Sequence, residues 1–126
     1  MPEPVIICLH QPALELAEKV ASLCDGEVHG LQSRVNTIPK TFEKTKEHLR
    51  ELFQKGHPLV GICSSGILIR SLADVLSDKH TEPPVLAVAE DGSCVIPLLG
   101  GHHGANELAR KIASGLGVVA AVTTAG

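Results

Sequence analysis

The amino-acid sequence predicts a three-layer α/β/α sandwich with a mainly parallel sheet and one antiparallel hairpin. Three observations support this prediction. Short apolar runs of strand length alternate with longer segments of helical periodicity. An Asp-Gly pair at 91–92 lies between two apolar runs, as in a hairpin turn. The chain has 126 residues, 44% hydrophobic and 20% charged, which suits one globular domain.

The first half of the chain contains two predicted strands and two predicted helices, which alternate over residues 5–9, 13–24, 27–31 and 41–56. The first strand, VIICL, is apolar and β-branched, as buried strands are. Apolar positions form one helical stripe in ALELAEKVASLC, and Gly26 follows as a stop signal. Thr41 is predicted to begin the second helix, a charged amphipathic segment that Gly56 ends.

The second half continues as strand, helix, two strands, helix and strand, over residues 58–63, 64–78, 83–91, 93–98, 104–117 and 118–124. Ser64 or Ser65 is the expected cap of the helix that begins there. The strands on either side of the Asp91-Gly92 turn form the antiparallel pair, and Gly117 marks the end of the last helix. No internal repeat or linker interrupts this pattern, so a single domain over 1–126 is expected.

Composition argues against several classes of partner. The formal net charge is −3 and no clustered Lys/Arg face is evident, which argues against nucleic acid and anionic membranes. The chain has no Trp or Tyr and only two Phe, so it lacks the aromatic platforms on which single-stranded nucleic acid stacks. No segment has the length of a membrane span, and no signal peptide is recognisable at the start. A cytoplasmic protein is therefore expected.

The four cysteines are far apart in sequence and form no C-x-x-C pair, at Cys8, Cys24, Cys63 and Cys94. In a reducing compartment, isolated cysteines are mostly small hydrophobic residues of the core. No metal site is predicted from them.

Two junctions between a strand and a helix carry residues suited to binding carboxylates. In open parallel sheets, ligands bind beyond the carboxyl ends of the strands, where helix N-termini also converge. In the first junction, the hydroxyls of Ser64 and Ser65 and the backbone N–H groups around Gly66 can contact an anion. A plain helix cap is the alternative interpretation. Arg70 interrupts an apolar run, so it either faces this pocket or extends along the surface.

The second junction, LLGGHHGAN, combines three glycines, two histidines and an asparagine, at Gly100, Gly101, Gly104, His102, His103 and Asn106. Gly100 and Gly101 permit positive φ and close approach of a ligand to the backbone, and the polar side chains add hydrogen-bond donors at the positive end of a helix. Adjacent histidines point in different directions and lack the i, i+4 spacing of zinc ligands, so a chelated metal is not predicted. A tight turn without function is the alternative.

These residues resemble a known family. The segments VGICSSGILIRSLADVLSDK and PPVLAVAEDGSCVIPLLGGHHGANELARKIASGLGVVAAVTTA closely resemble the N-terminal domain of the cobalamin-biosynthesis protein CbiG. The resemblance is strong over residues 58–125, and over 4–57 it extends only to the order of strands and helices. Its most specific features are Gly61, Ser65, Gly66, Arg70, Asp78, Lys79, VIPLL at 95–99 and GGHHGANELA at 100–109.

The resemblance implies a role in the anaerobic, early-cobalt branch of corrin synthesis. The family opens the ring-A δ-lactone of cobalt-precorrin-5A and releases acetaldehyde, so the implied ligand is a flat corrinoid fringed by carboxylates. The substrate carries the cobalt, and no cofactor of the protein is implied. His102 or His103 becomes the candidate general base, with backbone amides around 101–104 stabilising the oxyanion. The implied substrate-binding residues are Ser64, Ser65, Gly66, Arg70, Gly100, Gly101, Gly104 and Asn106.

Other possibilities stay open beside this one. Family enzymes are longer, so the 126 residues are expected to be a fragment or module that works with the C-terminal domains of a parent protein. Related domains also occur fused to precorrin-3B C(17)-methyltransferase, which makes a non-catalytic binding or docking module the alternative function. Direct ligation of cobalt by His102 or His103 is a weaker hypothesis. The oligomeric state is left open, with a homodimer as one option.

Overall fold

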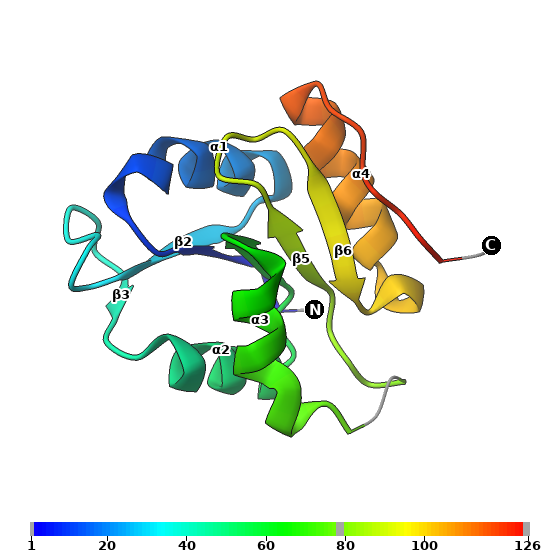
Figure 1. Cartoon of the computed structure of the whole chain (residues 1–126), viewed down its shortest axis with the longest axis horizontal. Helices are drawn as coiled ribbons and strands as arrows, with labels where there is room; N and C mark the ends of the chain where they lie inside the picture. The colour runs from blue at the N-terminus through cyan, green and yellow to red at the C-terminus, as the bar shows by residue number, and fades with distance from the viewer. Residues whose placement is uncertain (1, 78–79, 125–126) are drawn as a thin grey trace.

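A six-stranded sheet forms the middle layer of the molecule, with helices on both faces (Figure 1). The computed structural model describes residues 2–77 and 80–124. The strands lie in the order β3-β2-β1-β4-β5-β6, and all neighbours are parallel except the antiparallel pair β5 and β6. Their bounds are β1 Val5–Cys8, β2 Glu27–Leu31, β3 Thr41–Phe42, β4 Leu59–Ile62, β5 Val85–Val88 and β6 Val95–Leu99. The predicted fold class is confirmed.

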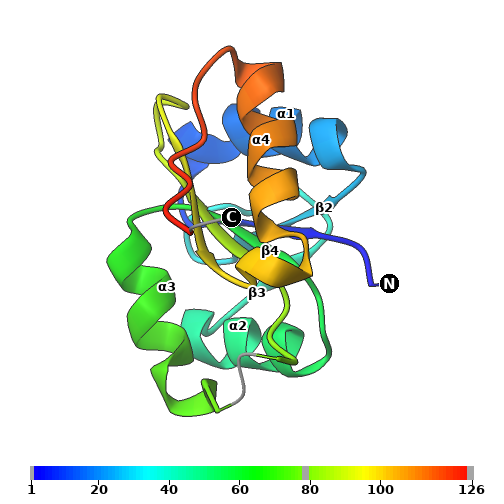
Figure 2. The same cartoon turned by 90° about the vertical axis from the view of Figure 1, so that its right-hand side faces the viewer.

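The helices form two layers, one on each face of the sheet. Helices α1 (Leu14–Cys24) and α4 (Ala105–Leu116) cover one face, and α2 (Thr45–Gln54) and α3 (Ser65–Leu72) cover the other (Figures 1 and 2). Short 3-10 turns precede α1, follow α3 and precede α4, at Gln11–Ala13, Ala73–Val75 and Gly101–His103. Among the described residues, no helix is long and apolar enough to cross a membrane.

The central strands are apolar at every position because each of their faces contacts a helix layer. In β1, Ile6 and Cys8 pack into the cluster beneath α1 and α4, whereas Val5 and Ile7 pack into the cluster beside α2 and α3. All four residues of β1 are buried, and the same holds for β4 and β5. This two-sided burial explains why these strands appear in the sequence as continuous apolar runs.

Helix α1 ends at the predicted position, but a different residue takes the left-handed conformation that ends it. Asp25 takes the left-handed conformation at φ 54°, one residue before the predicted glycine stop. Gly26 is required by close packing instead, because a Cβ there would lie 2.8 Å from the carbonyl oxygen of Pro4.

The helix predicted over 41–56 begins later than expected, at Thr45. Thr41 and Phe42 form β3, which pairs in parallel with the end of β2. The backbone N–H of Gln32 donates to the Phe42 carbonyl at 2.8 Å, and the Phe42 side chain is buried. The strand pairing and the burial of an aromatic ring therefore outweigh the helix signal at Thr41, which does not cap α2.

Helix α3 is shorter than the predicted span of 64–78. It ends at Leu72, the chain makes a 3-10 turn over Ala73–Val75, and Leu76 is extended. Asp74 is unfavourable in the last turn of a helix because its charge opposes the helix dipole, and it instead forms ion pairs with residues of α2. Asp78 and Lys79, two of the features that suggested the family, lie outside the described residues.

The strand predicted over 118–124 is wrong. This segment makes one parallel bridge, between Val95 of β6 and Ala120, in which the Ala121 N–H donates to the Val95 carbonyl at 2.8 Å. The next bond of a parallel ladder needs an N–H from position 97, and Pro97 has none. The pairing therefore stops after one bridge.

A pair of histidines joins β2 to α2. His29 Nδ1 lies 2.8 Å from His48 Nε2, His29 Nε2 lies 2.9 Å from Glu27 Oε1, and the His48 ring stacks on Phe42. Burial, followed by the charge of His29, lowers the pKa of His48 below its ordinary value of 6.5. Two imidazolium rings also lose the hydrogen bond between them, because both facing nitrogens then carry protons.

Acid is expected to destabilise the fold through His48. Below pH 6.5 the unfolded chain binds more protons at His48 than the folded protein does, so the free energy of unfolding falls as the pH falls. We expect this loss as the pH drops from about 7 to about 5, and a weaker pH dependence in a His48→Gln variant. Urea unfolding of both proteins at the two pH values measures it. Equal pH dependence in both would contradict the assignment.

Candidate functional site

The two predicted binding loops lie at opposite edges of the sheet. The serine loop, residues 64–66, follows β4 at the carboxyl edge of the sheet. The other parallel strands β1, β2 and β5 also end at this edge. Residues 100–106, the histidine loop, follow β6, which runs the other way. Leu99 pairs with Val85, the first residue of β5, so the histidine loop lies at the amino edge (Figure 1). Loops that follow parallel strands emerge at the carboxyl edge, but β6 is antiparallel. The structure therefore does not bring the two loops together.

The histidine loop has a tight and well-defined backbone. Gly100 has a φ of 75° and Gly104 a φ of 100°, values that L-residues rarely adopt. The Gly100 carbonyl accepts hydrogen bonds from the N–H groups of His103 at 2.8 Å and Ala105 at 3.1 Å. A Cβ on Gly100 would lie 2.9 Å from the backbone of residues 83 and 84. The loop is therefore pressed against the segment that precedes β5.

The structure distinguishes the two histidines of this loop. His103 is half-buried, and its Nδ1 lies 3.2 Å from the carbonyl oxygen of Glu82. A carbonyl only accepts hydrogen bonds, so Nδ1 donates, and in the neutral ring Nε2 then carries a lone pair. His102 is exposed. Of the two, His103 has the fixed orientation and the tautomer that a general base requires.

The other polar side chain of the histidine loop contacts the end of the described chain. Asn106 Nδ2 donates to the hydroxyl of Thr124 at 2.6 Å. A Cβ on Gly101 would lie 3.1 Å from the Thr124 methyl group. The segment after α4 therefore passes directly over this loop. Within residues 2–77 and 80–124, no group of three or more His, Cys, Asp or Glu side chains is arranged to hold a metal ion.

The serine loop brings four predicted residues together at the start of α3. Ser64 is the N-cap residue by position, but its hydroxyl makes no capping hydrogen bond, and α3 begins at Ser65. A Cβ on Gly66 would lie 3.0 Å from Nη1 of Arg70. The Arg70 guanidinium is therefore folded back over the first turn of the helix.

A groove of about 540 Å³ adjoins the serine loop, and we call it the basic groove. Its charged side chains are Arg34, Lys46 and Arg70, and its apolar ones are Leu9, Leu31 and Ile67. Sequence reasoning missed Arg34 and Lys46, which stand in segments predicted as a connection and as a charged helix surface. Their positions shortly after β2 and at the start of α2 were the available signal, since both places belong to the carboxyl edge.

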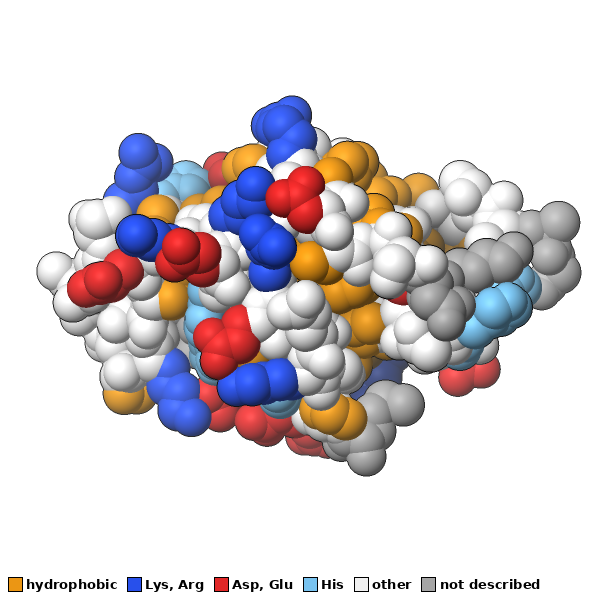
Figure 3. Space-filling view, turned by 90° about the horizontal axis from the view of Figure 1, so that it is seen from below, with side chains coloured by type: hydrophobic (Ala, Val, Ile, Leu, Met, Phe, Trp, Pro, Cys, Tyr) orange, Lys and Arg blue, Asp and Glu red, His pale blue; other side chains and the backbone are white. Residues whose placement is uncertain are grey.

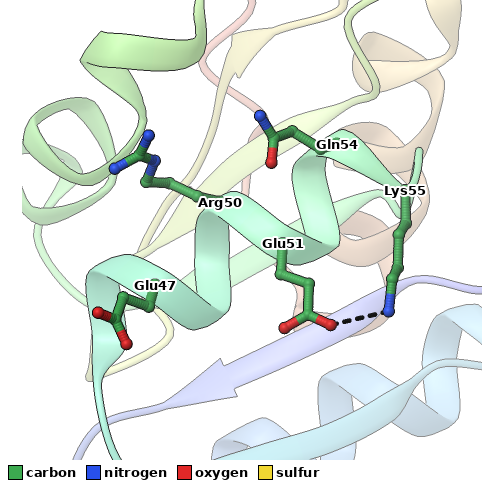
Figure 4. Close-up of a pocket in the computed structure, with 5 residues that line it drawn as sticks. All are labelled: Glu47, Arg50, Glu51, Gln54 and Lys55. Atoms are coloured by element: carbon green, nitrogen blue, oxygen red, sulfur yellow. Dashed lines mark hydrogen bonds and ion pairs between the residues drawn. The ribbon is translucent and has the colours of Figure 1, made fainter.

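A shallow depression on α2 has no converging groups. Glu51 and Lys55 form an ion pair at 2.8 Å one turn apart. Arg50 and Gln54 extend on the other side of the helix, and Glu47 points away from them (Figure 4). Exposed pairs of this kind contribute little energy. This face of α2 is an ordinary solvated surface.

An apolar groove lies between α3 and β6 on the side of α2 and α3, where Figure 3 shows a band of hydrophobic side chains. Ile69 is 53% exposed and Leu76 is 38% exposed at its rim. The described residues that line this groove contribute no polar side chain that could orient a ligand. It therefore adds no chemistry to the site.

Three of the four cysteines are buried, as predicted for core residues: Cys8, Cys24 and Cys63. Burial raises the pKa of the Cys63 thiol to about 11. This thiol therefore stays protonated at neutral pH and is a poor nucleophile, although it directly precedes the serine loop.

Comparison with known protein families gives a match to one family. The model of the cobalamin synthesis G N-terminal family matches residues 47–126, which is more than half of the chain. The matched range includes α2 from its third residue, α3, both candidate loops and α4.

Two similar curated proteins are cobalt-precorrin-5A hydrolases. The one from Priestia megaterium is 41% identical over 78 residues, covering 61% of this chain and 21% of its own length. The one from Salmonella typhimurium is 42% identical over 77 residues, covering 60% of this chain and 22% of its own length. The chain therefore spans about a fifth of the length of the curated relatives it matches.

A solved structure has the same fold. It is described as a cobalamin biosynthesis protein G homolog from Sulfolobus solfataricus, with a TM-score of 0.69 and 22% sequence identity. The match covers 96% of this chain and 36% of that chain. At this identity the likeness extends to the fold alone.

Proposed function

Since the chain belongs to the cobalamin synthesis G N-terminal family, which has a role in cobalamin synthesis, we propose that it binds a corrinoid intermediate. We further propose that it contributes to opening the ring-A lactone of cobalt-precorrin-5A with release of acetaldehyde. The names of the two curated relatives support this reaction. The catalytic groups are assigned to the histidine loop.

The observation that carries this assignment is the geometry of His103. Its Nδ1 is held by the Glu82 carbonyl at 3.2 Å, which leaves Nε2 to take a proton from water. The resulting hydroxide adds to the lactone carbonyl, the acyl–oxygen bond breaks, and the alkoxide that leaves takes up a proton. The products are a carboxylate and a free hydroxyl. The hydroxyl then loses its proton and becomes the carbonyl of acetaldehyde as the bond from its carbon to the ring breaks, and the ring carbon takes up a proton. His102, which is exposed beside it, is assigned to the substrate carboxylates.

The glycines of the histidine loop allow the ligand to approach the backbone. A Cβ on Gly104 would meet no atom within 4 Å, so this part of the loop faces open space. The amides of His103 and Ala105 already donate to Gly100, so the oxyanion is assigned to the remaining amides of residues 101–104. Gly100, Gly101 and Asn106 then shape this surface, at the positive end of α4.

A titration of the 126-residue chain with cobalt-precorrin-5A tests the proposal. Equilibrium dialysis reports binding, the absorption spectrum of the corrinoid reports ligation of its cobalt, and acetaldehyde is measured at the same time. We expect binding together with release of acetaldehyde. An unshifted corrinoid spectrum in the bound state would exclude ligation of the cobalt by His102 or His103. Failure to bind would contradict the proposal.

A second candidate function is a non-catalytic binding or docking module, such as one that serves a precorrin-3B C(17)-methyltransferase. The observation that favours it is the separation of the two loops. A single flat ring cannot contact both edges of a sheet whose faces are covered by helices. Binding of cobalt-precorrin-5A without release of acetaldehyde would support this candidate over the hydrolase.

A further inference from the structure

We propose that the basic groove is a second binding site, for a molecule that carries several carboxylates on an apolar body. The groove lies at the carboxyl edge, on the α2 and α3 side of the sheet. The chain order of the strands reverses between β1 and β4, and doubly wound sheets bind ligands in the crevice at this reversal. Leu9, directly after β1, and Ile67, in the helix after β4, both line the groove.

The charge of the groove is opposite to that of the whole chain. The chain has a net charge of −3, yet every charged side chain that lines the groove is basic. Lys46 has an acidic neighbour, Asp74 at 3.4 Å, but Asp74 is shared with Arg50 at 3.8 Å. Arg34 and Arg70 form no ion pair with any acidic residue in the described parts of the chain. Two guanidinium groups are therefore available to an anion.

Arg70 is placed where its charge is unfavourable without an anion. Its guanidinium lies over Gly66 in the first turn of α3, and the N-terminus of a helix is itself positive. Lys46 likewise lies in the first turn of α2. Neither helix has a side-chain capping hydrogen bond in the described structure. A negative group in the groove would be stabilised by both helix ends and both cations.

Ser71 adds a hydroxyl group to the basic groove. The residue is only 7% exposed, and it lines the groove. Within the described residues no hydrogen bond of its hydroxyl is found, and no fully enclosed polar side-chain atom lacks a partner, so this hydroxyl is open to solvent. A hydroxyl without an internal partner can donate to a carboxylate oxygen of a ligand.

The arrangement favours separated carboxylates over a single phosphate. Arg34, Lys46 and Arg70 come from the loop after β2, from α2 and from α3, so their charges surround the groove. The apolar side chains between them suit a hydrophobic body. The loop after β1, residues 9–12, contains no glycine, so the phosphate cradle of dinucleotide-binding sheets is missing. Among the described residues, no His, Asp or Glu side chain lines the groove, which suits binding and not catalysis.

Fluorescence titration with uroporphyrin I, a macrocycle with eight carboxylates, tests this site. We expect the Arg34→Gln/Arg70→Gln double variant to bind at least about tenfold more weakly than the unmodified chain, because two charge-assisted contacts are lost. The matched control is Arg110→Gln, which removes a positive charge from an exposed position of α4 and should leave affinity within about twofold. Equal weakening by the control, or unchanged binding by the double variant, would overturn the proposal.

Two further measurements keep the test decisive. Ser71→Ala removes a hydroxyl without an internal partner, so the fold should persist while porphyrin binding weakens several-fold. Unchanged binding by this variant would contradict the assigned contact. Citrate, a small carboxylate without an apolar body, should compete poorly with the porphyrin for the groove. If citrate binds as tightly as the porphyrin, an apolar body is not needed for binding and this part of the proposal is wrong. Release of acetaldehyde from cobalt-precorrin-5A by the Arg34→Gln/Arg70→Gln variant is measured separately, so this site and the proposed lactone chemistry can fail separately.

Discussion

Replacing His103 with alanine is expected to lower the rate of acetaldehyde release from cobalt-precorrin-5A by about 10²- to 10⁴-fold, the range typical of a lost general base. The reason is the bond from Nδ1 to the Glu82 carbonyl, which fixes the ring and leaves the lone pair of the neutral imidazole on Nε2. The rate is measured by coupling acetaldehyde to alcohol dehydrogenase and following NADH.

His102→Ala is the matched control because it removes the neighbouring imidazole from the same loop. We expect this variant to bind the corrinoid more weakly while keeping most of its maximal rate. Added imidazole should restore part of the rate to His103→Ala and none to His102→Ala. If the two variants lose equal activity, or if only His102→Ala is inactive, the ranking of the histidines is wrong.

Gly100→Ala is expected to reduce the free energy of unfolding by about 3 kcal/mol. Two effects add at this position. A residue with a Cβ is strained at φ 75°, and the new methyl group would lie 2.9 Å from the backbone of residues 83 and 84, which cannot rotate away. Denaturation by urea, followed by circular dichroism, measures the change.

Gly104→Ala separates these two effects. Its φ of 100° is also unfavourable for alanine, but the added methyl group would meet no atom within 4 Å. We expect a loss of about 1 kcal/mol, from backbone strain alone. Equal losses in the two variants would show that contact with the segment before β5 contributes nothing to stability.

The sequence was most informative where local pattern and tertiary packing agree. VIICL is apolar at every position because β1 is buried on both faces, and the Asp91-Gly92 turn leads into an antiparallel strand as predicted. It was least informative where a pairing partner decides the outcome. Thr41 has the character of a helix cap, but pairing with β2 and burial of Phe42 make it part of a strand.

The sequence located two candidate loops, but it did not predict how they are arranged in space. The histidine loop and the serine loop were both identified from short patterns, and each includes the first two residues of a helix. Their separation follows from the direction of β6, which reverses the edge at which its loop emerges. Arg34 and Lys46 have no local pattern that marks them. Only the assembled sheet brings them beside Arg70.

The proline that ends the pairing of β6 has a second consequence, for association between molecules. An open sheet can add a strand from another chain at either edge, which is a common route to aggregation. Here one edge strand, β3, has only two residues, and the other, β6, presents Pro97 in place of a donor. Neither edge offers a long row of unpaired N–H and C=O groups. Addition of a strand from another molecule is therefore disfavoured at both edges of this sheet.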